Sequence, residues 1–311
     1  MDDTAALGGA VLAHGSLIAV EVLGADAQYG EPLFEALAAP LPAQRAAAPP
    51  RLRLLLRQCV LRDGALVSLA HLLRSGRVAD LTIMPFEPGE FRAFSAGVLA
   101  LLDALRDGAP LTSLELSGFR MPRNVLAALL RAVTGHPTLA ALKLCGNMEW
   151  GAGAEAQRVV GDALAELLGA NAPALTRLDV HEDGLSDVGL APMCAALARN
   201  SALRCLGVSA AAMSTSFAAD VLAPAARACV SLRSLSSPED NSDGFGAHDL
   251  QELQRQRDVH RIIKDANAAL QEQLPQGWPG GRGYVQGDGM PRAQGAQNAD
   301  DDSGGAGPSG A

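Results

Sequence analysis

The chain has 311 residues, 48% of them hydrophobic, and a formal net charge of −9 at pH 7. The negative charge and the lack of basic clusters argue against a nucleic-acid partner, and the absence of an uninterrupted apolar stretch long enough to cross a bilayer argues against a membrane role. The 5 cysteines, without a CxxC pair, favour a reducing compartment over a disulfide framework or a zinc site. We therefore expect a cytoplasmic protein with no metal and no cofactor.

The first residues, Met1-Asp2-Asp3-Thr4, are acidic where a secretory signal would be basic. The apolar stretch that follows them is interrupted by Gly8 and Gly9, so export through the general secretory route is not expected. We interpret residues 1–16 as a lead-in or cap for the segments that follow.

Eight segments that fit the pattern L-x-x-L-x-L come next. Apart from Ser237, their fourth and sixth residues are apolar and alternate with the third, fifth and seventh, which is the period of a short strand with one buried face. Stretches between them, such as 124–133, 159–168 and 188–197, carry Ala and Leu at helical spacing. Residues 17–240 therefore predict a repeated strand–loop–helix unit. The segments begin at Leu17, Arg51, Val78, Leu111, Leu139, Leu175, Leu203 and Leu232.

This pattern resembles the leucine-rich-repeat family, and specifically its ribonuclease-inhibitor-like branch, over roughly Leu17 to Asp240. In that family the ninth place of each unit, usually Asn or Cys, turns the chain off the strand, and Cys59 and Asn147 fit it here. The resemblance implies an α/β solenoid, a curved right-handed stack of about eight repeats with a concave parallel sheet and convex helices. One sheet face of such a stack is left open for a protein partner.

Two phrases in the helical stretches, Asp63-Gly64-Ala65-Leu66 and Gly161-Asp162-Ala163-Leu164-Ala165, are similar to the Gly-Ala-Leu-Ala repeats of effectors that plant-associated bacteria inject into host cells. This narrower resemblance implies an alternative location, inside a host cell after delivery by a type III system. No cleavage motif is expected for that route.

The third, fifth and seventh residues of each segment should form three lateral rows on the open face. Neighbours within a row should lie one strand apart, so Glu115, Lys143 and Asp179 should form an alternating-charge ladder and Arg53 should lie beside Asp80. These charges either contact a partner or simply stabilise a wet sheet. The candidate partner-binding residues of this face are Arg53, Arg57, Asp80, Glu115, Lys143, Cys145, Arg177, Asp179 and His181.

One of these rows places Cys145 beside His181, a thiol next to an imidazole that Asp179 could orient. An open repeat face offers no closed pocket and no oxyanion donors, so a cysteine-dependent enzyme is a remote alternative. We therefore expect no catalytic residue.

Aromatic residues are scarce, so those near the loops are informative. Trp150 lies in an insertion that lengthens one repeat, and Phe119-Arg120 occupies the corresponding turn of the preceding repeat. Insertions in solenoids become rim loops, so Phe119, Arg120 and Trp150 are candidate partner contacts. The alternative is that Trp150 folds back over the core.

After residue 240, apolar residues recur at helical spacing among charged ones as far as Leu274, which predicts an amphipathic helix within 241–274. It either caps the last repeat or binds a partner. Residues 275–311 are rich in Gly and Pro and predict a disordered tail.

These expectations favour a monomeric, non-enzymatic module that binds a partner protein on its concave face and rim loops. The alternative is a substrate-recognition subunit that recruits a ubiquitin ligase or another enzyme through its C-terminal helix.

Overall fold

In the computed structural model, the described residues are 19–23, 27–38, 51–85, 94–148, 153–181, 184–237 and 250–273. All of them belong to one compact unit, Met1–Leu274, whereas Pro275–Ala311 is a second unit. The predicted lead-in at 1–16 and the predicted disordered tail at 275–311 therefore lie outside the described residues.

The described strands form one parallel sheet of eight strands, and the strands follow one another across the sheet in chain order. Each predicted segment supplies one strand, so the prediction of a repeated strand in a parallel sheet is confirmed. The strands are β1 (Ala19–Leu23), β2 (Leu52–Cys59), β3 (Val78–Pro85), β4 (Ser113–Ser117), β5 (Ala141–Cys145), β6 (Arg177–His181), β7 (Cys205–Val208) and β8 (Ser234–Ser236).

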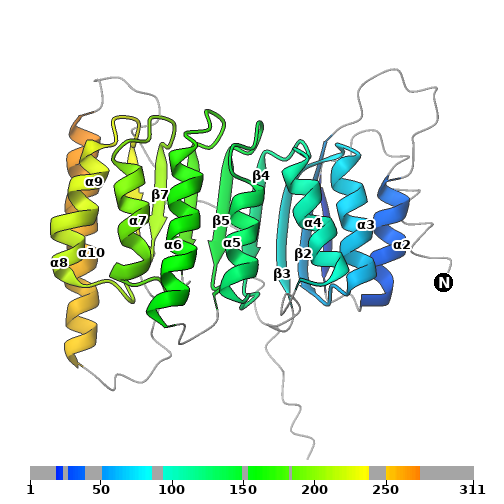
Figure 1. Cartoon of the computed structure of the whole chain (residues 1–311), viewed down its shortest axis with the longest axis horizontal. Coiled ribbons are helices and arrows are strands. Elements are labelled where there is room, and N and C mark those ends of the chain that lie inside the picture. The colour runs from blue at the N-terminus through cyan, green and yellow to red at the C-terminus, as the bar shows by residue number, and fades with distance from the viewer. Residues whose placement is uncertain are drawn as a thin grey trace, which may run out of the picture. The chain divides into compact units, whose positions relative to one another are not determined.

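Helical segments connect successive strands and lie together on one face of the sheet (Figure 1). The stretches predicted at 124–133, 159–168 and 188–197 are helical, and the middle one begins five residues earlier than expected, at Ala154. The connecting segments are α2 (Ala27–Ala38), α3 (Asp63–Arg74), α4 (Ala96–Arg106), α5 (Arg123–Ala132), α6 (Ala154–Gly169), α7 (Asp187–Leu197), α8 (Thr215–Phe217), the π-helical η1 (Ala218–Leu222) and α9 (Ala223–Ala228).

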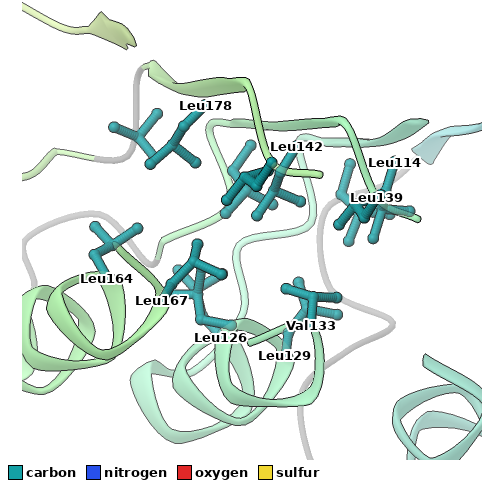
Figure 2. Close-up of a cluster of buried hydrophobic side chains, with 14 of the residues drawn as sticks. Leu114, Leu126, Leu129, Val133, Leu139, Leu142, Leu164, Leu167 and Leu178 are labelled. Atoms are coloured by element: carbon teal, nitrogen blue, oxygen red, sulfur yellow. The ribbon is translucent and has the colours of Figure 1, made fainter. Parts of the chain in front are cut away.

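The core lies between the sheet and this helical layer. Leu114, Leu142 and Leu178 are register partners on β4, β5 and β6, and all three are buried. Figure 2 shows these leucines facing apolar side chains such as Leu126 of α5 and Leu164 of α6. Burial of such side chains is the main force that holds each unit on the next.

The buried side chains of Asn147 and Cys59 form hydrogen bonds with the backbone at the turns that follow β4 and β1. The amide nitrogen Nδ2 of Asn147 donates to the carbonyl of Leu116 at 2.8 Å, and its Oδ1 accepts from the backbone N–H of Phe119 at 3.4 Å. One end of the sheet repeats this arrangement, where Cys59 Sγ donates to the carbonyl of Val22 at 3.4 Å. Both side chains therefore tie their own unit to the preceding one, which satisfies backbone groups that burial would otherwise leave unpaired.

In the turns that lead into the strands, side chains also form hydrogen bonds with the backbone. His136 Nδ1 accepts from the backbone N–H of Leu139 at 3.1 Å, and Asn200 Oδ1 accepts from that of Leu203 at 2.7 Å. Each acceptor stands three residues before the start of its segment. Asn200 also donates to the carbonyl of Leu168 at 2.8 Å, which again links neighbouring units.

The helix α10 (Leu250–Glu272) packs on the last unit. Its side chains Val259, Ile263 and Leu270 are buried. Asn267 Oδ1 accepts from the backbone N–H of Leu235 at 3.0 Å, so this helix supplies a partner for a donor on the edge strand β8. The helix predicted within 241–274 is therefore confirmed, and the side chains of Leu250 and Leu253 lie outside the described part.

Candidate functional site

The sheet face opposite the helices carries the predicted rows of outward residues. In the part of the chain that the structure describes, no helix covers this face (Figure 1), and we call it the open face. The register of the rows containing Arg53 and Glu115 is the one predicted, from β1 through to β8. In the remaining row, the neighbours Leu23–Arg57–Met84 and Ser117–Cys145–His181 are also confirmed.

The centre of the open face contains an ion pair between neighbouring strands. Lys143 Nζ lies 2.8 Å from Glu115 Oε1, and the side chain of Lys143 is 41% exposed while that of Glu115 is 25% exposed. Burial alone would lower the pKa of Lys143, but the hydrogen bond and the charge of Glu115 outweigh it and raise the pKa. Lys143 is therefore a fixed cation that stands further into solvent than its partner.

The ladder does not continue as an exposed pair with Asp179. The side chain of Asp179 is only 4% exposed, and its carboxylate accepts from Arg177 Nε at 2.7 Å and faces His181 Nε2 at 3.6 Å. Burial alone would raise the pKa of Asp179, but its contacts with His181 and Arg177 outweigh it and hold the pKa below its usual value. Asp179 was expected to contact a partner, and it lies instead beneath Arg177 as a buried, satisfied carboxylate.

Gly207 on the neighbouring strand makes this burial possible. A Cβ atom at Gly207 would lie 2.6 Å from Cε1 and 2.7 Å from Nε2 of His181, and closer still to the Asp179 carboxylate. Both side chains therefore occupy the space that a side chain at Gly207 would fill. The sequence does hold the signal, because Gly207 is the single glycine in the predicted outward rows, but its role was missed.

The position of the His181 imidazole decides whether it can activate Cys145, the thiol considered as a nucleophile. Cys145 and His181 are register partners on β5 and β6. The imidazole atoms nearest Gly207 lie toward β7, which is on the other side of β6 from Cys145. Among the described residues, the buried Nδ1 of His181 has no hydrogen-bond partner, so this nitrogen does not accept a hydrogen bond from the Cys145 thiol.

The cations near the start of the sheet differ in their partners. Arg57 Nη1 lies 3.4 Å from Glu21 Oε1. Arg53 lies beside Asp80 in register, as predicted, but Asp80 Oδ1 accepts from Thr112 Oγ1 at 2.7 Å. Within the described ranges Arg53 is exposed and makes no ion pair or side-chain hydrogen bond.

The three residues predicted to contact a partner at the rim, Phe119, Arg120 and Trp150, differ in where the structure places them. Phe119 is fully buried in the core, so its expected place on the surface is wrong. The chain turns at Gly118, with φ of +80°; after this turn Phe119 is buried in the core, and its backbone N–H donates to Asn147 Oδ1. Arg120 is exposed and adopts a φ of 48°, while Trp150 lies outside the described residues.

No described helix has the length and apolar character needed to span a membrane. No group of His, Cys, Asp and Glu in that part of the chain has the geometry to hold a metal ion.

Comparison with known proteins found no family model that matches the chain and no curated protein that matches it.

Proposed function

We propose that this chain is a non-enzymatic leucine-rich-repeat module of the ribonuclease-inhibitor-like type, which holds a partner protein on a concave open face and on the adjoining rim at Arg120. The observation that carries the proposal is the open face itself. Its outward residues stand in register across the sheet, and no described helix covers them. Parallel sheets are normally covered on both faces, so a partner would complete the missing layer.

The chemistry of the open face supports binding better than catalysis. Its central charged groups are already paired, as Glu115 with Lys143 and Asp179 with Arg177. Cys145 and His181 are in register, and the Nδ1 of His181 accepts no hydrogen bond from a described residue. Such a surface offers fixed charges and short polar side chains for contact, and the Gly-Ala-Leu-Ala-like phrases favour a module that acts as an effector inside a host cell.

A pair of steric variants tests the proposal. Ala141 is half-buried on the open face, whereas Ala195 is exposed on α7 in the helical layer. Ala141→Trp should block a partner on the open face, and Ala195→Trp is the matched control. The wild type and both variants are used to capture proteins from lysates of the source cells and of a candidate host, after thermal unfolding has shown that all three are folded.

We expect a protein that the wild type and Ala195→Trp recover and that Ala141→Trp loses. Recovery that is equal for both variants, or that is lost only with Ala195→Trp, contradicts the proposal.

A further inference from the structure

On the open face the positive charges stand outward and the negative charges lie deeper. Arg177 is 51% exposed while its partner Asp179 is 4% exposed, and Lys143 is also more exposed than Glu115. A molecule that approaches β4 to β6 therefore meets cations before carboxylates. The order is reversed between Glu21 and Arg57 at the β1 end, where the carboxylate is the more exposed partner.

Two other arginines in this region have no partner within the described chain. Arg53 is exposed on β2, and Arg204 is exposed at the residue before β7. Arg177 and Cys205 are register partners on β6 and β7, and Arg204 directly precedes Cys205. Burial raises the pKa of the Cys205 thiol, and the charges of Arg177 and Arg204 oppose that rise. Arg204 therefore adds a charge beside Arg177 at the same part of the sheet.

Together, Arg53, Lys143, Arg177 and Arg204 form what we call the cation set. It runs from β2 to the start of β7, which is five strand spacings or about 24 Å. An extended peptide covers that distance with about seven residues. Between Arg53 and Arg177 the same row contains the small residues Ser113 and Ala141, which leave the cations as the longest side chains of that row.

We propose that the partner segment held on the open face is an acidic extended peptide, which crosses the strands and places separate carboxylates against the cation set. This inference rests on the proposed function. Arg53 and Arg204 supply charges that no described residue neutralises, and the side chains of Arg177 and Lys143 stand further into solvent than the carboxylates of Asp179 and Glu115. The chain's net charge of −9 does not prevent this contact, because charges beyond about 8 Å are largely screened at physiological ionic strength.

The same arrangement disfavours a nucleic acid as occupant. Asp80 and Glu115 lie between Arg53 and Lys143 along the sheet, so an evenly charged phosphate backbone would meet carboxylates as well as cations. The outward residues of the described strands include no Phe, Tyr or Trp on which bases could stack. Separate carboxylates with neutral residues between them fit this alternation better.

The test uses the full chain and three rhodamine-labelled peptides of twelve residues, in which glycine alternates with glutamate, glutamine or lysine. Fluorescence anisotropy at about 0.15 M salt should show binding of the glutamate peptide alone, and binding should weaken as salt rises further. A single-stranded oligonucleotide of twelve thymidines is the fourth probe. Absence of binding by the glutamate peptide, or tighter binding by the lysine peptide or the oligonucleotide, would overturn the inference.

Charge-reversal variants locate the site. Arg53→Glu with Lys143→Glu should weaken binding of the glutamate peptide by about tenfold, since each exposed ion pair contributes modestly. Arg53→Glu alone should give a smaller loss, and it breaks no described contact, so folding is preserved. Arg158 is exposed on α6 and also lacks a described partner, so Arg158→Glu should leave binding unchanged.

Equal effects of Arg53→Glu and Arg158→Glu would also overturn the inference. In that case the loss of a lysate partner with Ala141→Trp would still support the proposed function, so the failures of the two proposals can be distinguished.

Discussion

The two faces of the same strands follow different physical rules. Leu142 and Lys143 are adjacent on β5, yet Leu142 is buried under the helical layer while Lys143 stands on the open face. The interior face depends on apolar burial, and every side chain there is held by several neighbours. The open face carries the ion pair of Lys143 with Glu115, which is in contact with water and contributes little to stability. The comparison indicates that the interior determines the fold and leaves the open face available for binding.

The largest expected effect comes from the interior. Leu142 is 0% exposed and packs between two leucines of the neighbouring strands. Leu142→Ala should lower the free energy of unfolding by about 2–5 kcal/mol, because it removes buried methyl groups and leaves a cavity. Urea denaturation of the wild type and the variant measures this loss. A change below about 1 kcal/mol would show that the site is not part of a packed core.

A somewhat smaller loss of unfolding free energy should follow when the buried hydrogen bonds of Asn147 are removed. Asn147→Ala removes one hydrogen bond to the Leu116 carbonyl and one to the Phe119 N–H, and each hydrogen bond contributes about 0.5–1.5 kcal/mol. The matched variant is Asn147→Cys, because Cys59 donates to a carbonyl of the preceding unit from the same place in its own repeat. Urea denaturation should rank stability as wild type, then Asn147→Cys, then Asn147→Ala. Equal stability of all three proteins would mean that the Asn147 side chain does not form these hydrogen bonds.

The third prediction concerns pH. Burial lowers the pKa of His136, although the backbone of Ala109 opposes this, and Nδ1 must stay unprotonated to accept from Leu139. The unfolded chain therefore takes up this proton first, so stability is fully present above about pH 6.5 and falls as the pH drops toward the lowered pKa, by at most about 1.4 kcal/mol per pH unit.

Asn200 makes the corresponding hydrogen bond without a titrating group. His136→Asn should therefore keep the hydrogen bond and flatten the decline in stability between pH 7.5 and 5.5, as measured by urea denaturation at both values. If the loss of stability between the two pH values is the same in His136→Asn as in the wild type, the pH dependence comes from other groups.

The smallest expected effect belongs to the open face. Lys143→Gln removes the ion pair with Glu115, and we expect a loss of about 0–1 kcal/mol because both side chains are partly exposed. The loss should shrink further in about 1 M salt, where charges are screened within about 3 Å. Thermal unfolding at low and high salt measures both values. A loss as large as that of Leu142→Ala would mean that the two faces do not differ as described.

The strands and their register could be predicted because the apolar residues repeat with one period in every segment. A shift of one residue would move all of them to the opposite face, so a pattern such as Leu142–Lys143–Leu144 allows a single register. The alternation of β strands and helices followed from the same segments and the Ala-rich stretches between them.

Other features depend on contacts that alternation does not encode. The sequence places Asp179 on the open face, but its burial needs the space left by Gly207 on the next strand and donors from Arg177 and His181. Phe119 was expected at the surface because it lies in a turn, yet after the turn at Gly118 it is buried in the core. Such outcomes follow from backbone conformation and neighbouring units, not from the pattern of one segment.

The most direct test of the open face as the binding surface is photo-crosslinking from defined positions. Thr82 lies in the central row of the open face, and Ala195 lies on the helical layer. A benzophenone amino acid is placed at one position or the other in the full chain and irradiated in the lysate that yields the captured partner. We predict a covalent adduct with that partner from position 82 and none from position 195; an adduct from position 195 alone, or from neither position, would contradict the account.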